Sequence, residues 1–150
     1  MDAKICDFGV ARLLNDDGSC SPGDDDGKRF DEETMTGGVG TARWAAPEVI
    51  IGQQRYTTAV DMYSFGVILS ELDSRALPYA DQPSLPESAL LSLVCSGELR
   101  PQFRTASPPE IVELGGRCLA FQPMLRPSAV EAAYVLRQSL ARCQQSSHIA

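Results

Sequence analysis

The stretch "KICDFGVARLL", Lys4 to Leu14, places an acidic turn between two short apolar runs. Residues 3–6 have the composition of a short strand and residues 10–14 that of a second extended run, and we predict both. Between them, Asp7 is followed two residues later by Gly9, which lets the backbone turn because it has no Cβ. Asp-x-Gly turns are common in proteins, so the meaning of this one depends on the sequences that follow it.

The composition is that of an ordinary globular protein, with 150 residues of which 43% are hydrophobic and 22% charged. A chain of this length forms one domain or part of one. The net charge of −7 offers no basic surface, so nucleic acid and anionic membranes are not predicted as partners. No apolar run approaches the roughly 18 residues of a membrane span, and no signal peptide is evident. We therefore predict an intracellular, cytoplasmic location, with any targeting region outside these residues.

Neither the cysteines nor the acidic segment predicts a metal site. The five cysteines are widely spaced without a Cys-x-x-Cys pair, and the single histidine is His148, so we expect reduced thiols and no zinc site. Residues 15–33, "NDDGSCSPGDDDGKRFDEE", are acidic and rich in glycine, which favours a solvated loop. A calcium-binding loop is the alternative there, but Pro22 would take its first ligand position and has no side-chain oxygen.

Four Ser/Thr-x-x-Asp/Glu patterns mark candidate helix starts in the second part of the chain. In such a capping box the hydroxyl accepts a hydrogen bond from an amide of the first turn, and the acid reaches back to the capping residue. The four patterns are Thr58-x-x-Asp61, Ser84-x-x-Glu87, Ser107-x-x-Glu110 and Ser128-x-x-Glu131. We predict helices near 58–73, 85–96, 108–120 and 128–142, with Pro108 at the first helical position of the third.

The first and last of these helices differ in where their apolar residues lie. The first is apolar around most of its circumference, which is typical of a helix in the centre of a domain. Its apolar residues are Val60, Met62, Tyr63, Phe65, Val67, Ile68, Leu69 and Leu72. The last is amphipathic, and we expect five residues to face the core while Glu131, Arg137 and Arg142 face solvent. The five are Val130, Ala133, Tyr134, Leu136 and Leu140.

The order and spacing of four stretches carry a family resemblance. Asp7-Phe8-Gly9 is followed by "GVGTARWAAPEV" at 38–49, "DMYSFGVIL" at 61–69 and "CLAFQPMLRPS" at 118–128. Together they resemble the second half of a protein kinase catalytic domain, in the variant typical of the tyrosine-kinase-like group of serine/threonine kinases. The resemblance extends from residue 3 to about residue 142. It implies a mainly α, partial protein-kinase-like fold: a C-terminal lobe with an activation segment and about four to five helices, without the N-terminal lobe or the catalytic loop.

The resemblance assigns the first motif to cofactor binding. Asp7 matches the family's metal ligand, a carboxylate for the Mg²⁺ ion that bridges the phosphates of ATP. Phe8 and Gly9 complete this cofactor-binding turn, and the packing of the phenylalanine distinguishes active from inactive states. Thr34 and Thr36 fall in the activation segment and are the preferred candidate phosphorylation sites, because a phosphate there would order the loop by pairing with arginines.

The resemblance also assigns roles to four residues of the later motifs. Glu48 is expected to pair with Arg126 in a mostly buried ion pair that anchors the activation segment. Thr41, after Gly40, matches the threonine that hydrogen-bonds near the catalytic aspartate, in the form typical of serine/threonine kinases. Asp61 matches the aspartate that supports the catalytic loop, and it also fits the role of a helix-start acid, since both roles use the same carboxylate geometry.

Several parts that the family needs for catalysis are not found in these 150 residues. Phosphoryl transfer also requires a Gly-rich loop, a strand lysine and a His-Arg-Asp loop, whereas the lysines here are Lys4 and Lys28 and the histidine is His148. We therefore expect a fragment of a serine/threonine kinase that transfers the γ-phosphate of ATP to protein hydroxyls. Alone it should be inactive and should bind neither ATP nor Mg²⁺ tightly.

The alternative function is a non-catalytic kinase-lobe module that binds another kinase or the missing N-terminal portion. In both cases the helix that flanks the central helix in the family is missing, so a contiguous apolar patch should be exposed and solubility should be poor. The predicted organisation is a metal-binding turn and activation segment at 3–48, a helical lobe at 49–142 and a tail at 143–150.

Overall fold

The computed structural model describes residues 41–53, 57–104 and 106–147, and these residues are mainly α-helical. The elements are η2 (Thr41–Trp44), α2 (Pro47–Ile50), α3 (Ala59–Ser74), α4 (Glu87–Cys95), α5 (Pro109–Cys118), η3 (Pro123–Leu125) and α6 (Ala129–Ser147). The predicted mainly α class is confirmed for this part of the chain. The strand at 3–6, the extended run at 10–14 and the acidic loop at 15–33 lie outside the described residues.

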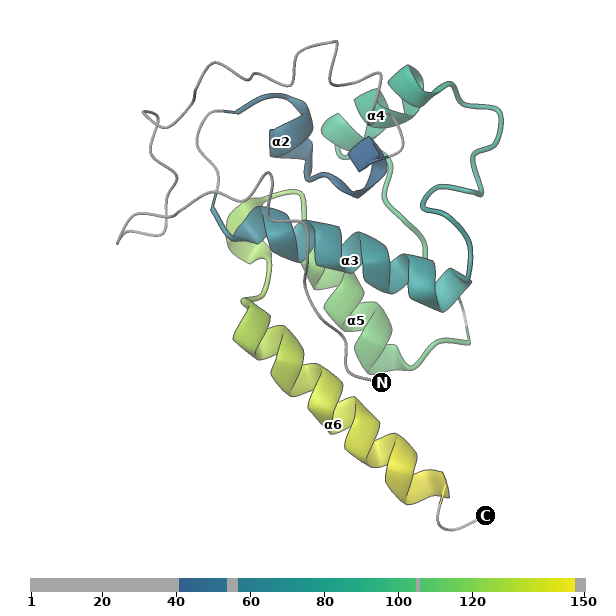
Figure 1. The fold of residues 1–150 in the computed structure, drawn as a ribbon, viewed down its shortest axis with the longest axis vertical. Helices are drawn as coiled ribbons and strands as arrows, with labels where there is room; N and C mark the ends of the chain where they lie inside the picture. The colour runs from purple at the N-terminus through teal and green to yellow at the C-terminus, as the bar shows by residue number, and fades with distance from the viewer. Residues whose placement is uncertain (1–40, 54–56, 105, 148–150) are drawn as a thin grey trace.

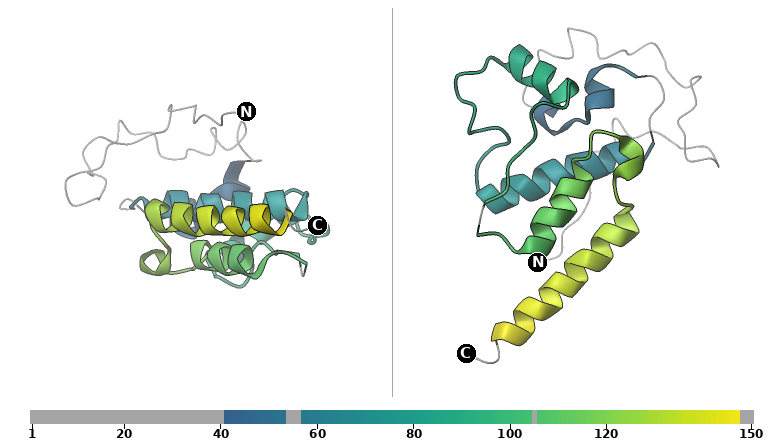
Figure 2. Two further views of the ribbon diagram at one scale, coloured as in Figure 1. Left: turned by 90° about the horizontal axis from the view of Figure 1, so that it is seen from below. Right: turned by 180° about the vertical axis from the view of Figure 1, so that it is seen from behind.

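Helix α3 lies at the centre of the described structure (Figure 1). The elements η2, α2 and α4 lie on one side of it, and α5 and α6 lie on the other. Figure 2, seen from behind, shows α5 crossing in front of α3. Helix α5 contacts both α3 and α6, so α5 connects the central helix to the last one.

Two clusters of buried side chains form the core on opposite sides of α3. In the first, Tyr63 and Val67 of α3 pack with residues of α4 and of the connecting segments. The other members of this cluster are Ala46, Tyr79, Leu90, Leu91, Val94 and Leu119. In the second, Met62 of α3 packs with Leu114 and Cys118 of α5 and Ala132 of α6. The central position predicted for this helix is therefore confirmed.

A glycine lets α3 and α5 approach each other closely. A Cβ added at Gly66 would lie 2.7 Å from the Cβ of Cys118, so any larger residue would force the helices apart. Met62 is on the same helix and packs with Cys118 in the second cluster. The close crossing of α3 and α5 is thus encoded by the absence of a side chain at Gly66.

One face of α3 is exposed, although apolar residues occupy most of the circumference of this helix. Ile68 is 43% exposed and Leu72 is 71% exposed, while Phe65 and Leu69 are partly buried against the second cluster. The described helices pack on two sides of α3 only. The exposed side chains form the kind of apolar face that the sequence predicts for a lobe without its flanking helix.

The inward face predicted for α6 is right for Leu136, which packs against the second cluster, and wrong for three of the other four residues. Val130, Tyr134 and Leu140 are 80%, 62% and 59% exposed, whereas Ala132 and Ser139 are buried. Ala132 and Ser139 lie seven residues apart, which places them on one side of the helix, and Val130 lies nearly opposite Ala132. Helix α6 packs against α5 along this seam of small residues, and the local pattern could not identify α5 as its neighbour.

Only one of the four predicted capping boxes forms, the one at the start of α6. There the Ser128 N–H donates to Oε2 of Glu131 at 2.7 Å, and the Glu131 N–H donates to Oγ of Ser128 at 3.3 Å. Helices α3, α4 and α5 have no side-chain cap. Pro86 and Pro108 are the residues before α4 and α5, so the predicted placement of Pro108 inside its helix is also wrong.

The failed caps have physical causes. The ring of Pro86 or Pro108 fixes φ near the value seen there, with ψ of 151° and 131° keeping the backbone extended just before each helix. Ser107 and Glu87 are instead bonded to distant residues, Asp73 and Arg43.

Within the described ranges, no helix combines the length and hydrophobicity that crossing a bilayer requires.

Candidate functional site

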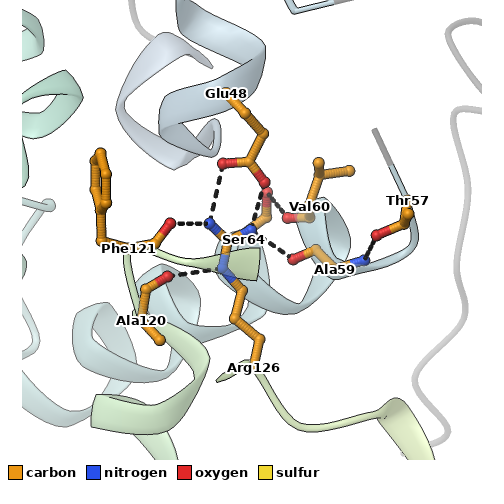
Figure 3. A network of polar contacts seen from close by, with 8 residues as sticks. All are labelled: Glu48, Thr57, Ala59, Val60, Ser64, Ala120, Phe121 and Arg126. Atoms are coloured by element: carbon orange, nitrogen blue, oxygen red, sulfur yellow. Dashed lines mark hydrogen bonds and ion pairs between the residues drawn. The ribbon is translucent and has the colours of Figure 1, made fainter. Parts of the chain in front are cut away.

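The ion pair between Glu48 and Arg126 joins two motifs that lie 78 residues apart in the sequence. Nη1 of Arg126 donates to Oε1 of Glu48 at 2.6 Å, and Nη2 donates to Oε2 at 2.9 Å (Figure 3). The side chain of Glu48 is 7% exposed and that of Arg126 is 0% exposed. The geometry is the two-pronged arrangement that makes arginine–carboxylate pairs strong and directional. The pair expected from the resemblance is therefore present in the structure.

Arg126 also bonds three main-chain carbonyls around this pair. Its Nε donates to the carbonyl of Ala120 at 2.8 Å, Nη1 to that of Ala59 at 2.9 Å and Nη2 to that of Phe121 at 3.2 Å (Figure 3). The guanidinium also lies 5.0 Å from the ring centroid of Tyr63, a favourable cation–π distance. Arg126 thus ties α2, the start of α3 and the segment after α5 together, and its buried charge is fully solvated by protein groups.

Asp61 lies in the first turn of α3 and its side chain is exposed. Among the described residues its carboxylate has no hydrogen bond or ion pair. At this position the negative charge favours the positive end of the helix dipole. Both oxygens point to no other described group, so the carboxylate keeps its full capacity to accept hydrogen bonds from another segment.

The short helix η2 begins at Thr41, whose side chain is exposed, and its other end is held by two long-range contacts. Nη2 of Arg43 donates to Oε2 of Glu87 at 2.6 Å, and Nε1 of Trp44 donates to Oε2 of Glu71 at 2.9 Å. The sequence did not predict either contact. The sequence gives one indication of these contacts: Arg43 and Trp44 lie in the same motif as Thr41.

The other predicted site residues cannot be placed relative to these. Asp7, Phe8, Gly9, Thr34 and Thr36 all lie outside the described residues. In the ranges that the structure describes, there is no group of three or more His, Cys, Asp or Glu side chains that could hold a metal ion.

Two of the cysteines are buried or half-buried thiols without a disulfide bond. Burial raises the pKa of Cys118 to about 11, and burial also raises the pKa of Cys95. A thiol must be deprotonated to act as a nucleophile or as a metal ligand. Both groups are therefore protonated near neutral pH, and Cys118 acts as a small apolar residue of the second core cluster.

Asp73, at the end of α3, fastens the loop that leads to α5. Its Oδ1 accepts from Oγ of Ser107 at 2.5 Å, and its Oδ2 accepts from the N–H of Arg104 at 2.7 Å. Burial alone would raise the pKa of Asp73, but these hydrogen bonds outweigh it and lower the pKa below its ordinary value of 3.8. The ionised carboxylate therefore stabilises the folded protein at pH values above 3.8. This stabilisation is lost as the pH falls through the lowered pKa of Asp73.

Replacing Asp73 with Asn is expected to reduce the free energy of unfolding at pH 7 by about 1–3 kcal/mol, because an amide has one acceptor oxygen where the carboxylate uses two, so one of the two donors loses its acceptor. The difference between the two proteins should shrink as the pH falls below the ordinary value of 3.8 and through the lowered pKa of Asp73. Urea unfolding of dilute protein at a series of pH values measures this. A difference that stays constant down to the lowest pH would contradict the assigned pKa direction.

Comparison with known proteins gives a consistent result. The sequence matches the family description "Protein kinase domain" over residues 1–136. It is 33% identical to a probable serine/threonine-protein kinase of Dictyostelium discoideum over 92% of the chain and 13% of that protein. It is 34% identical to serine/threonine-protein kinase STY17 of Arabidopsis thaliana over 90% of the chain and 20% of that protein. It is 36% identical to serine/threonine/tyrosine-protein kinase HT1 of the same plant over 92% of the chain and 30% of that protein. The chain thus spans less than a third of each of these relatives.

Proposed function

Because the chain belongs to the protein kinase domain family, we propose that it is part of an enzyme that transfers the γ-phosphoryl group of ATP to serine and threonine hydroxyls of proteins. The observation that carries the proposal is the buried Glu48–Arg126 pair. This pair holds α2 in place, and α2 follows the Thr41 segment in the chain. The names of the relatives, which are serine/threonine kinases, support it. The Gly40-Thr41 sequence supports a preference for serine and threonine and a place in the tyrosine-kinase-like group.

The protein kinase domain implies ATP and Mg²⁺ as cofactors of a complete domain. Asp7, with Phe8 and Gly9, would hold the metal ion, which offsets negative charge on the transferring phosphoryl group when bound. Thr41 would lie beside the catalytic aspartate, which is not among these residues. The carboxylate of Asp61, which has no partner within the part of the chain that the structure describes, would accept hydrogen bonds from the backbone of the catalytic loop. Thr34 or Thr36 would be the activating phosphorylation site.

The open face of α3 supports the proposal that these helices are completed by another part of a kinase domain. Ile68 and Leu72 are exposed on that face, next to the partly buried Phe65 and Leu69. Covering such side chains contributes about 1.5–3 kcal/mol for each one fully buried. We therefore propose the organisation predicted from the sequence, in which residues 49–142 form the helical lobe, 3–48 the metal-binding turn and activation segment, and 143–150 a tail.

The second candidate is a non-catalytic module that uses the same face to bind another kinase or a separate N-terminal portion. The observation that favours it is compositional: no His-Arg-Asp sequence occurs in the 150 residues, and the two lysines are Lys4 and Lys28. Both candidates require a protein to cover Ile68 and Leu72. They differ in whether the covering segment supplies the catalytic base and the nucleotide-binding lysine.

We expect the 150-residue chain alone to transfer no phosphate to dephosphorylated casein and to show no saturable binding of Mg²⁺–ATP. The same residues, expressed within the longest open reading frame that contains them, should phosphorylate casein on serine and threonine. Asp7→Ala should lower kcat in that protein by about 100-fold or more, because the metal ligand acts on the transition state. Radiolabel transfer from ATP, followed by phosphoamino acid analysis, measures both.

Two results would decide against parts of this proposal. Phosphorylation of casein by the 150-residue chain, abolished by Asp7→Ala, would show that these residues suffice for catalysis. A reading frame that adds no Gly-rich loop and no His-Arg-Asp sequence would favour the interaction module over the enzyme.

A further inference from the structure

Arg43 makes an unusually complete set of contacts for a side chain that is still partly exposed. Its Nε lies 3.1 and 3.0 Å from the two carboxylate oxygens of Glu87, and its Nη2 lies 2.6 Å from Oε2. The remaining nitrogen, Nη1, donates to the carbonyl of Pro78 at 3.2 Å. The two side chains are 28% and 24% exposed. All three nitrogens of the guanidinium therefore have protein partners.

Arg43 and its two partners lie on three separate segments. Arg43 belongs to η2, two residues after Thr41, and Glu87 is the first residue of α4. Pro78 belongs to the connection between α3 and α4, next to Tyr79, which is 3% exposed and has a left-handed φ of 63°. A left-handed conformation costs a non-glycine residue about 1–2 kcal/mol, so the contacts around Tyr79 must hold it there.

The neighbouring residue fixes the same short helix to α3. Nε1 of Trp44 donates to Oε2 of Glu71 at 2.9 Å, and Trp44 also packs against the first core cluster. Helix η2 is therefore held to α4 by Arg43 and to α3 by Trp44. A segment of four residues held at two consecutive positions by different helices cannot shift relative to either one without breaking a hydrogen bond.

We propose that Arg43 and Glu87 are a positioning pair that holds the Thr41 segment at a fixed place against the N-terminus of α4, and that this fixes where a protein substrate is held. This inference rests on the proposed kinase function, because Thr41 matches the threonine that hydrogen-bonds near the catalytic aspartate, where the hydroxyl group of a protein substrate must lie. Neither residue would touch the reacting atoms. Both would act through the placement of Thr41, since small displacements of a positioned substrate cost large factors in rate.

An exposed ion pair elsewhere in the chain provides a matched control. Arg117 and Glu131 are 3.7 Å apart and their side chains are 46% and 57% exposed. Exposed pairs of this kind contribute little to stability. Removing Arg117 therefore controls for the loss of one surface charge without disturbing η2 or α4.

The first test uses Trp44, the only tryptophan of the chain, as a local probe that does not depend on catalysis. Arg43→Met and Glu87→Gln should each raise the acrylamide quenching constant of the tryptophan fluorescence about twofold, because local opening of η2 exposes the ring. The double variant should match the single ones, since the two residues act as a unit. Arg117→Met should leave quenching unchanged, and the charge exchange Arg43→Glu with Glu87→Arg should restore part of the protection.

The second test uses the phosphorylating form of the protein with dephosphorylated casein as substrate. Arg43→Met should raise the KM for casein about tenfold, while the KM for ATP changes less than about twofold. A merely structural role would change both KM values, or it would lower the apparent kcat through loss of folded protein while leaving both KM values unchanged. Arg43→Lys should behave like Arg43→Met for casein, because lysine keeps the charge but not the planar fork.

Each outcome separates the two claims. Unchanged Trp44 quenching in Arg43→Met, additive effects in the double variant, or parallel changes in both KM values would overturn the positioning pair while leaving the kinase function intact. Absence of phosphoryl transfer in every form would overturn the proposed function and the substrate role together. In that case altered quenching would show only that Arg43 and Glu87 hold η2.

Discussion

Replacing Arg126 with Met is expected to lower the free energy of unfolding by about 3–5 kcal/mol, because the Glu48 carboxylate would remain buried without its counter-charge. Glu48 is 6% exposed as a whole residue, so water cannot replace the guanidinium without opening the structure. Methionine also donates no hydrogen bonds, which leaves the carbonyls of Ala59, Ala120 and Phe121 without this donor. Urea unfolding of dilute protein, followed by far-UV circular dichroism, measures the loss.

Three further variants identify the cause of that loss. Arg117→Met removes an exposed arginine and should change the free energy of unfolding by no more than about 0.5 kcal/mol. Arg126→Lys keeps the charge but cannot reach both carboxylate oxygens and the carbonyls at once, so its effect should be intermediate. Adding Glu48→Met to Arg126→Met removes the stranded charge and should recover part of the stability.

The double replacement should not recover all of it. The carbonyl of Ala59 belongs to the first residue of α3, and that of Ala120 lies just beyond the end of α5. The carbonyl of Ala59 keeps its bond within the helix, but the part-buried carbonyl of Ala120 gains no new donor when both charges are removed, and an unsatisfied acceptor costs up to about 1–3 kcal/mol when it is buried. If Arg126→Met were no more harmful than Arg117→Met, the buried pair would not anchor α2, and the observation on which the proposed function rests would be lost.

The Glu48–Arg126 pair could be predicted from sequence because both partners belong to recognisable motifs. The helices were predictable for a different reason, since the hydrophobic period and the start signals are local. The caps were not, because a hydroxyl or carboxylate at a helix start has other possible partners. Ser107 bonds to Asp73 and Glu87 bonds to Arg43, and neither distant partner is visible in a local pattern.

The contacts around Thr41 show the same limit. Arg43 and Glu87 are 44 residues apart, and Trp44 and Glu71 are 27 apart. No spacing rule joins them, so only the folded chain shows that η2 is held by two helices. The side of α6 that faces the core was predicted correctly at Leu136, which packs against the second cluster, but Ala132 and Ser139 were missed because they contribute less to a hydrophobic pattern than Val130 or Tyr134 do. Small residues mark a close helix contact only once the neighbouring helix is known.

Replacing Gly115 with Ala is expected to lower the free energy of unfolding by about 1–3 kcal/mol, despite the better helix propensity of alanine. A Cβ added there would lie 2.0 Å from Cζ of Phe103 and within 3 Å of both Cε atoms. The ring cannot simply move away, since Phe103 packs against the first core cluster and the adjacent Arg104 N–H is bonded to Asp73. Thermal unfolding in dilute solution measures the effect.

Gly116 provides the matched control, because it is the next residue of the same helix and a Cβ there would meet nothing within 4 Å. Gly116→Ala should therefore be neutral or should stabilise the chain by up to about 1 kcal/mol, the gain in helix propensity. Combining Gly115→Ala with Phe103→Ala should remove the clash but leave a cavity, so it should not restore full stability. Equal effects of the two glycine replacements would mean that Phe103 does not lie on Gly115. The contact of Phe103 with α5 would then not help to hold the segment that Asp73 binds.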